Sequence, residues 1–410
     1  MPRRSAAITP KEVERLRGDF PMLSVKMNGK PLVYLDSAAT SQKPQAMIDR
    51  LEEVYSREYA RPEEGYALSK GATKAFEGVR AQIAELINAA EPREIVFCRG
   101  ATEATNLVAR AVEHDHLGEG DVIVVSEAEH HSNIVPWLMA CKAKGARLSA
   151  VPITPSGDLD LDALEPLLTD RVRLVAVNHV SNVTGAVLPV ERVTAIAHER
   201  GIPVLVDGAQ AVPHLPVDVR AIGCEFYAGS GHKMGGPSSV GFLYGQAAVL
   251  ESLPVGEGGS MMVAKVTFDD FEPKPPPHKY EAGEPAFGEV TGWGPAIEYW
   301  SKIGLDRIAA YERAIAREAA DSLREIDRVG VLGDPADRIA VVSFTVDGMP
   351  AKDVEQALDR KGIAVRAGNL ESQPQLKALG TEEAVRASFS FYNTSAEVET
   401  LAKALKAIVR

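Results

Sequence analysis

Short runs of apolar residues alternate with segments of helical periodicity between about residue 75 and residue 210. One such segment, Val190–Arg200, carries apolar residues at helical spacing between two of the runs. Strands that alternate with helices are typical of crossover units in a largely parallel sheet. The N-terminal two-thirds of the chain is therefore predicted to be an α/β domain, with strands at Glu94–Cys98, Asp121–Val125, Arg147–Ile153, Leu174–Asn178 and Ile202–Asp207.

The pattern changes after the loop Glu272–Pro277 and the turn-rich stretch Gly283–Gly294. A long helical pattern comes first, at Leu305–Ile326. Three strand-like runs with helices between them follow, at Ile339–Val346, Ile363–Arg366 and Ala387–Phe391. This order predicts a smaller α+β domain. We therefore expect an N-terminal segment (1–20) that packs on the small domain, a large domain (21–300) and a C-terminal small domain (301–410).

The composition narrows the class of protein. A chain of 410 residues with a formal charge of −12 and no basic face gives no indication of nucleic-acid binding. No apolar stretch approaches the roughly 18 residues of a membrane span, and no secretory h-region follows the basic N-terminus. The three cysteines lack disulfide or metal-ligand spacing, so we expect a cytoplasmic protein without a metal site.

Polar side chains follow the predicted strands at the points where the strands end. Ligands of open parallel sheets bind beyond the carboxyl ends of the strands, so these residues are the first to consider. These positions are unusually polar, and they form five clusters: Arg99–Glu103, Glu129–Asn133, His179–Asn182, Asp207–Gln210 and Ser230–Lys233.

Together these clusters contain the groups that pyridoxal 5'-phosphate (PLP) needs. Its aldehyde binds a lysine, its ring nitrogen a carboxylate, and its phosphate the backbone N–H groups at a helix N-terminus. Lys233, Asp207 and the Gly100–Thr102 turn fit these roles. Each residue alone has an ordinary alternative, Asp207 as a helix cap and Lys233 as a solvated surface lysine. Their convergence at successive strand ends favours the cofactor site.

Longer motifs resemble the group II cysteine desulfurases of the class V aminotransferase superfamily, which are PLP-dependent transferases of fold type I. The match runs over nearly the whole chain and rests on five segments, Leu35–Thr40, Glu129–Trp137, His179–Asn182, Val206–Val212 and Ser230–Lys233. The resemblance implies a large domain with a mainly parallel seven-stranded sheet, a smaller α+β domain, and a homodimer with shared active sites.

The resemblance also implies a role for each matching residue. Lys233 would be the Schiff-base and proton-shuttling lysine, and His130 would stack on the pyridine ring. Around the cofactor it places Asp207 at the ring nitrogen, Gln210 at the phenolic oxygen, and Ala101, Thr102, Ser230 and His232 at the phosphate end. The substrate would meet Ala38, Asn182, Arg366 and Arg386, and a planar guanidinium suits its carboxylate.

The sequence departs from the family in the loop that carries the persulfide-forming cysteine. Arg366–Pro374 reads Arg-Ala-Gly-Asn-Leu-Glu-Ser-Gln-Pro, where the family shows Arg-x-Gly-His-His-Cys-Ala-x-Pro, so Glu371 takes the place of the cysteine. A carboxylate cannot accept sulfur as a persulfide. Glu371 is either an acid or base in the cleft or a solvated glutamate on a loop.

Two further departures affect the same cleft. The family's Arg-Gly-x-His is Glu64–Ala67 here, and its Ala-Gly-Thr-Pro is Ala282–Pro285, with Glu284 in place of the threonine that reaches the partner's cofactor phosphate. Glu284 would repel a phosphate unless it turns away or is paired. Cys98, Cys141 and Cys224 lie in predicted strand or helix segments or beside them, where packing is the expected role.

These observations leave three functions open. The first is a PLP lyase that expels a β- or γ-substituent of a small amino acid, with Lys233, His130 and Glu371 as catalytic residues. The second is another PLP reaction on the same scaffold, namely transamination, epimerisation, decarboxylation or carbon–carbon bond formation. The third is a non-catalytic, partner-binding protein of the PLP fold. Metal hydrolysis and dinucleotide binding lack their motifs.

Overall fold

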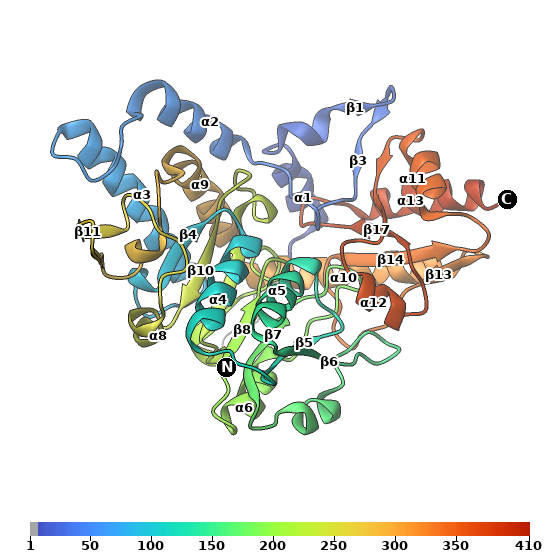
Figure 1. Cartoon of the computed structure of the whole chain (residues 1–410). Helices are drawn as coiled ribbons and strands as arrows, with labels where there is room; N and C mark the ends of the chain where they lie inside the picture. The colour runs from blue at the N-terminus through green and yellow to red at the C-terminus, as the bar shows by residue number, and fades with distance from the viewer. Residues whose placement is uncertain (1–6) are drawn as a thin grey trace.

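A computed structural model describes residues 7–410 of the chain. Its centre is a seven-stranded sheet whose strands follow the order β4-β10-β9-β8-β7-β5-β6 (Figure 1). All neighbouring strands are parallel except β10, which is antiparallel to both β4 and β9. The predicted mainly parallel sheet is thereby confirmed. The strands are β4 (Ile95–Cys98), β5 (Val122–Ser126), β6 (Arg147–Val151), β7 (Val172–Asn178), β8 (Val204–Asp207), β9 (Phe226–Ser230) and β10 (Gly241–Gly245).

Both faces of this sheet are covered by helices, which explains why its strands are continuous apolar runs. In β5, Val122 and Val124 belong to one hydrophobic cluster and Ile123 and Val125 to another, as alternation along a strand requires. Helices α3 (Ala67–Leu86), α6 (Val190–His198) and α9 (Phe287–Ile303) contribute to the first cluster, and α4 (Ala101–Asp115) and α5 (Val135–Lys144) to the second. The remaining helices of this region are α2 (Gln45–Glu53), α7 (Val219–Ile222) and α8 (Ala247–Ser252).

A second, antiparallel sheet forms the core of the C-terminal part of the chain. Its strand order is β13-β14-β17-β16, and α10, α11 and α13 contribute apolar residues to the cluster beside it. The elements are α10 (Leu305–Arg324), β13 (Val329–Val331), β14 (Val341–Val346), α11 (Ala351–Asp359), β16 (Arg366–Gly368), α12 (Gln373–Ala378), β17 (Ala384–Ser388) and α13 (Ser395–Ile408).

Two strand predictions in this part were wrong in detail. The strand expected at Ala387–Phe391 is β17 and begins three residues earlier, at Ala384. The run Ile363–Arg366 is not one strand: β15 (Ile363–Ala364) pairs in parallel with β3 (Val33–Tyr34), whereas Arg366 begins β16 and pairs with β17. One apolar run thus changes its hydrogen-bonding partner after Ala364, which the apolar pattern alone does not reveal.

The N-terminal helix α1 (Pro10–Arg17) contacts the C-terminal part of the chain. Arg17 forms an ion pair with Glu397 of α13 at 3.1 Å, and Glu12 pairs with Arg307 of α10 at 2.8 Å. Residues 1–6 of the expected N-terminal segment lie outside the described part of the chain, and its packing on a small domain stays a prediction. The domain bounds at residues 20 and 300 stay predictions.

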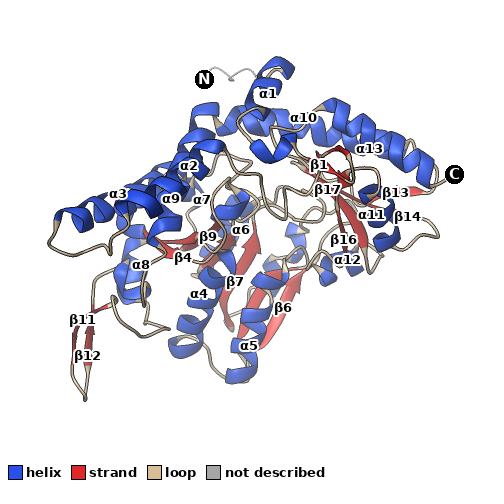
Figure 2. Cartoon of the chain, turned by 90° about the horizontal axis from the view of Figure 1, so that it is seen from above, coloured by secondary structure: helices blue, strands red, loops and turns tan. Residues whose placement is uncertain are grey.

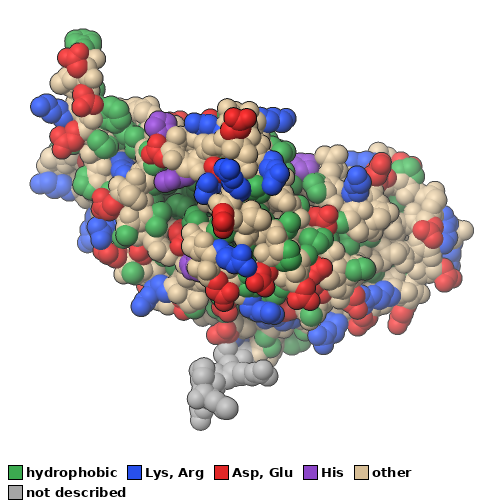
Figure 3. All heavy atoms as spheres, turned by 60° about the horizontal axis from the view of Figure 1, so that its bottom comes forward, with side chains coloured by type: hydrophobic (Ala, Val, Ile, Leu, Met, Phe, Trp, Pro, Cys, Tyr) green, Lys and Arg blue, Asp and Glu red, His purple; other side chains and the backbone are tan. Residues whose placement is uncertain are grey.

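A thin hairpin projects from the body of the molecule (Figure 2). It consists of β11 (Val263–Val266) and β12 (Phe271–Pro273), and Phe268 at its turn is fully exposed. On the face shown in Figure 3, acidic and basic side chains are interspersed rather than gathered by sign. Within residues 7–410, no helix has the length and apolarity needed to cross a membrane.

Candidate active site

A pocket of about 290 Å³ opens where the strands of the large sheet end and the strand pair β16–β17 approaches them. It brings together every residue that the sequence assigned to cofactor, substrate or catalysis. These are Ala38, Ala101, Thr102, His130, Asn182, Asp207, Gln210, Ser230, His232, Lys233, Arg366, Glu371 and Arg386. Their individual roles stay predictions, but their convergence is a property of the fold.

Lys233 and Asp207 reach this pocket from neighbouring parallel strands. Asp207 ends β8, and Lys233 lies in a short 3-10 turn directly after β9. Burial lowers the pKa of Lys233 to about 8, although the nearby Asp207 charge opposes the shift. Burial also raises the pKa of Asp207, against the effects of the Ala209 N–H, 2.9 Å away, and of Lys233. The site therefore contains an amine whose pKa is lowered to about 8 beside a buried acid.

The N-terminus of α4 forms one end of the pocket. Gly100 precedes the helix with φ of +144°, and a Cβ there would lie 3.2 Å from the Ser230 hydroxyl oxygen. The Ala101 N–H donates to that same oxygen at 2.9 Å. Thr102, in the first turn, is exposed, and Gly100 at the N-cap position has no side chain that could accept from this turn. The N–H groups of the first turn that follow Ala101 suit a phosphate.

His232 is held beside this end through its backbone. Its carbonyl oxygen accepts hydrogen bonds from the Thr40 hydroxyl at 3.0 Å and from the Lys43 ammonium at 2.9 Å. Burial, with the charges of Lys233 and Lys43, lowers the pKa of the His232 side chain to about 4. The imidazole is therefore neutral at physiological pH and can donate one N–H to an anion.

The hydrogen bonds of His130 define its tautomer. The backbone N–H of Ser132 donates to Nδ1 at 3.1 Å, so Nδ1 is an acceptor and the proton of the neutral ring lies on Nε2. Nε2 lies 3.2 Å from a carboxylate oxygen of Glu371 and can donate to it. Burial lowers the pKa of His130 to about 3, and the positive charge of Lys233 adds to the shift.

The buried Glu129 is hydrogen-bonded to the segment that carries His130. The Glu129 carboxylate accepts hydrogen bonds from the Ser126 hydroxyl, from the Asn133 amide at 2.7 Å and from the Asn178 N–H at 2.9 Å. Burial nevertheless raises its pKa to about 8. These contacts join β5 and β7 to the turn that carries His130.

Arg386 lies in the wall of the pocket that the small domain contributes. Its side chain is 3% exposed, and it donates to the Asn182 carbonyl and to the Asp36 carboxylate, both at 3.1 Å. Its Nε is buried without a partner among the described residues. This arginine can therefore still donate to a carboxylate that enters the pocket.

The loop that carries Glu371 closes over the pocket from the same side. One carboxylate oxygen of Glu371 lies 2.6 Å from Arg366 Nη2, and the other faces His130. Leu370 and Glu371 both have left-handed backbone conformations, with φ of +51° and +55°. The Asn182 amide donates to the Leu370 carbonyl at 2.9 Å, and the His131 N–H donates to that of Glu371 at 2.7 Å. Glu371 is half exposed and lines the pocket, and both of its carboxylate oxygens have partners.

The residues present fit PLP. Three buried polar atoms that line the pocket lack partners within the described part of the chain, Asn178 Oδ1, Gln210 Oε1 and Arg386 Nε. Buried polar atoms are nearly always paired, so these are expected to meet a polar ligand. With the Lys233 amine, the Asp207 carboxylate and the uncapped end of α4, the donor set matches an aldehyde, a ring nitrogen and a phosphate.

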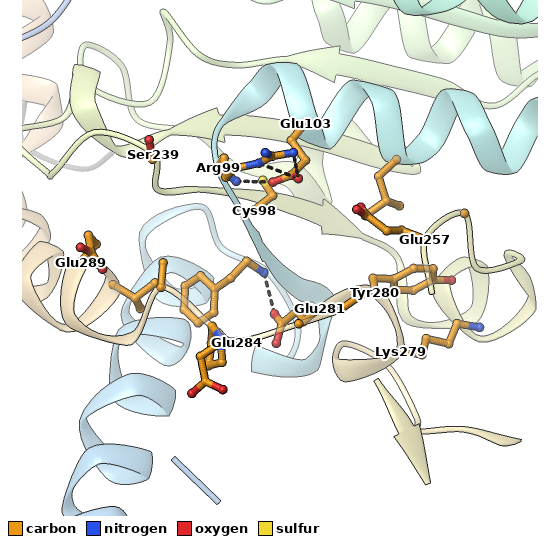
Figure 4. A pocket seen from close by; sticks show the side chains of 18 of the residues that line it. Cys98, Arg99, Glu103, Ser239, Glu257, Lys279, Tyr280, Glu281, Glu284 and Glu289 are labelled. Carbon is orange, nitrogen blue, oxygen red and sulfur yellow. Dashed lines mark hydrogen bonds and ion pairs between the residues drawn. The ribbon is translucent and has the colours of Figure 1, made fainter. Parts of the chain in front are cut away.

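A second, larger cavity of about 640 Å³ is lined by residues of β4, of α4 and of the segment Lys279–Ala286 (Figure 4). Several of its charged residues are paired: Arg99 contacts Glu103 at 2.6 Å, and Glu281 contacts Arg80, which lies outside the cavity, at 2.6 Å. Glu284 lines this cavity, not the smaller pocket, and pairs with Arg61 at 3.3 Å. In Figure 4 the Glu284 carboxylate points away from Arg99 and Glu103. Glu284 is therefore paired within this chain, which is one of the two conditions under which it would not repel a phosphate.

The three cysteines, all within the described residues, do not line the smaller pocket. Cys98 lines the larger cavity, and burial raises the pKa of its thiol to about 12. Cys141 and Cys224 are buried, and burial raises the pKa of each. A high pKa keeps a thiol protonated and unreactive, as the packing interpretation expects.

Sequence reasoning missed three contributors to the pocket and its surroundings. Asn178, the last residue of β7, has the same strand-end position as Asp207 and could have been named by that rule. Asp36 lies within a recognised motif, but its pairing with Arg386 across the chain leaves no local signal. Arg61 likewise reveals its pairing with Glu284 only in three dimensions.

Comparison with known proteins agrees with this geometry. The sequence model of the aminotransferase class-V family matches residues 33–401. A cysteine desulfurase of Klebsiella pneumoniae is 44% identical over 97% of this chain and 98% of its own. A cysteine desulfurase of Synechococcus elongatus is 42% identical over 98% of this chain, which spans only 65% of that relative. A probable cysteine desulfurase of Mycolicibacterium paratuberculosis is 43% identical, and the chain spans 58% of it.

Solved structures show the same relationship. The cysteine desulfurase CsdA of Escherichia coli, in its S-sulfonic acid form, has a TM-score of 0.90 and 36% identity over 96% of this chain and 98% of its own. Apo cysteine desulfurase of Thermococcus onnurineus has a TM-score of 0.91 and 33% identity over 98% of this chain and 99% of its own. The fold also resembles C-DES, solved with glycine covalently linked to its PLP cofactor, at a TM-score of 0.83 and 22% identity.

A fold of this kind around a lysine, a buried acid and an open helix end defines a PLP-dependent enzyme of fold type I. The chain belongs to the class V aminotransferase family and is similar to its cysteine desulfurases. Its cofactor is PLP.

Proposed function

We propose that this protein is a PLP lyase that breaks a C–S bond at the β- or γ-carbon of a small amino acid by elimination. It expels a thiol and forms no persulfide. The observation that carries the proposal is Glu371, a carboxylate on the loop over the pocket, with no cysteine among the residues that line the pocket. A persulfide mechanism needs a thiolate at that place. Elimination does not.

The residues of the pocket suit this chemistry. When bound, PLP supplies an electron-accepting ring beside the α-carbon of the substrate. Arg386 binds the substrate carboxylate through its free Nε, and Asn182 flanks it. Lys233 takes the α-proton at Nζ, for which a pKa of about 8 is suitable at neutral pH. Asp207, the last residue of β8, would hold the ring nitrogen of the cofactor.

Departure of the substituent needs a proton donor. We assign this role to Lys233, because after it takes the α-proton its ammonium can give a proton to the leaving thiolate. The neutral His130 ring carries its proton on Nε2, 3.2 Å from Glu371, so the two groups form a hydrogen-bonded pair. We assign to this pair the positioning of the leaving group.

The product mixture tests the proposal. The PLP-loaded protein is incubated with cysteine and with its S-alkyl and S-aryl conjugates, and 2-oxo acid, ammonia, free thiol, alanine and protein-bound persulfide are all measured. Elimination from cysteine consumes one water and gives pyruvate, ammonia and hydrogen sulfide in equal amounts. Alanine with protein persulfide, or no 2-oxo acid from any conjugate, would contradict the proposal. A Glu371→Cys variant is the matched control, since only it is expected to form persulfide at that position.

A further inference from the structure

Arg366 and Arg386 are direct partners across two antiparallel strands. In the register of β16 with β17, Arg366 lies opposite Arg386, so both side chains leave the sheet on the same face. Both line the 290 Å³ pocket. Two adjacent guanidinium groups at one pocket are the arrangement that would hold a dicarboxylate, one carboxylate on each arginine.

The two arginines differ in their burial and in how their guanidinium groups are engaged. Arg386 is buried and keeps an unpartnered Nε although Asp36 and Asn182 contact its terminal nitrogens. Arg366 is 37% exposed and is engaged by the Glu371 carboxylate at 2.6 Å. The first arginine can still receive a carboxylate, whereas the second already has one from its own chain.

Glu371 is held in this position by more than the ion pair. Its second carboxylate oxygen faces His130 Nε2 at 3.2 Å, and its backbone N–H donates to the Asn369 side chain at 3.0 Å. Its carbonyl accepts from the His131 N–H at 2.7 Å. An anionic substrate side chain would have to displace this carboxylate or lie beside it, and both cost free energy.

We propose that Glu371 determines the substrate specificity of this site by occupying Arg366, so that amino acids with anionic side chains are excluded and those with neutral or cationic side chains are accepted. The inference rests on the proposed function only in placing the substrate carboxylate on Arg386. It assigns to Glu371 a role in recognition in addition to its contact with His130. Its removal would convert a monocarboxylate site into a dicarboxylate site.

Binding of two unreactive carboxylates tests this. Butyrate and succinate have the same chain length and differ in the second carboxylate, and their affinities for the PLP-loaded protein are measured by isothermal titration calorimetry. The native protein is expected to bind succinate no more tightly than butyrate. In Glu371→Gln the ratio of succinate to butyrate affinity should rise about fivefold, the size of one partly exposed ion pair. Adding Arg366→Gln to that variant should abolish the rise.

Thermal melting of each variant shows that it is folded, and Glu371 is exposed enough for glutamine to be tolerated. A ratio that changes less than twofold in Glu371→Gln, a native protein that prefers succinate, or failure of both ligands to bind would overturn the inference. No turnover is involved. If the altered ratio is found while no 2-oxo acid forms from any conjugate, the specificity role stands and the lyase proposal fails.

Discussion

Replacement of Arg386 by lysine tests the assignment of the substrate carboxylate. Lysine keeps the positive charge but loses the planar pair of donors that can hold both oxygens of a carboxylate. In the native protein the free Nε of Arg386 and the adjacent terminal nitrogen can hold both oxygens of a carboxylate while Asp36 and the Asn182 carbonyl stay bound. Arg386→Lys should therefore weaken substrate binding while the fold and the cofactor remain.

The magnitude follows from the hydrogen bond to the carboxylate that lysine cannot form. One charge-assisted hydrogen bond is worth about 1.5–3 kcal/mol, so the loss of one of two should raise the dissociation constant about 10- to 150-fold. The effect is measured as the amino-acid concentration that half-shifts the visible absorption of the bound cofactor. Arg366→Lys is the control, because its ion pair with Glu371 is partly exposed and should contribute only a few-fold.

A matched ligand pair separates recognition from general damage. An amino-acid amide lacks the carboxylate, so Arg386→Lys should hardly change its binding. Equal weakening of the amino acid and its amide, or a change of less than threefold for the amino acid, would refute the assignment. Melting temperatures of the variants check that the fold survives the change at Arg386, which also binds Asp36 and Asn182.

Three other perturbations have defined outcomes. In the apoprotein, the acetylation of Lys233 by an amine reagent should have its midpoint near pH 8, because burial lowers the pKa of Lys233 and only the neutral amine reacts. The extent of acetylation is measured by mass spectrometry of the peptide that contains Lys233. A midpoint near pH 10.5 would contradict this expectation. Asp207→Asn should keep bound PLP but slow exchange of the substrate α-proton in D₂O at least about tenfold, since a charge-assisted hydrogen bond to the ring nitrogen is lost. The exchange is followed by NMR, and an unchanged rate would argue against the assignment of Asp207 to the ring nitrogen. Gly208→Ala should lower the free energy of unfolding by about 1–3 kcal/mol, because the new Cβ would lie 2.0 Å from a Tyr227 ring carbon. Denaturant unfolding measures this change. Gly65→Ala is the control, because a Cβ at Gly65 meets nothing within 4 Å.

The large domain was predictable because its strands are buried on both faces and read as apolar runs. Val122–Ser126 and Val204–Asp207 are entirely buried, and their flanking polar residues marked the strand ends. β10 was not predicted: Gly241–Gly245 begins and ends with glycine and has neither a long apolar run nor alternation. The run after Gly362 was predicted as one strand because its division between two sheets depends on distant partners.

The cofactor residues were predictable for the same reason: Asp207 is the last residue of its strand, Lys233 lies in the turn after the next, and the edge of a parallel sheet brings such residues together. Pairings of side chains were not. The contacts of Glu371 with Arg366 and His130, and of Glu284 with Arg61, depend on loop conformations that bring together segments distant in the sequence. The sequence identified Glu371 as unusual, and the fold defined its partners.

The visible absorption spectrum of the purified protein, recorded before and after addition of amino acids that include cysteine and its S-conjugates, is the most direct test of the cofactor chemistry. We expect a band of bound PLP that disappears in Lys233→Ala and that shifts with one class of amino acid. Absence of the band, with added PLP failing to restore it, would contradict the conclusion that this chain is a PLP enzyme acting through Lys233.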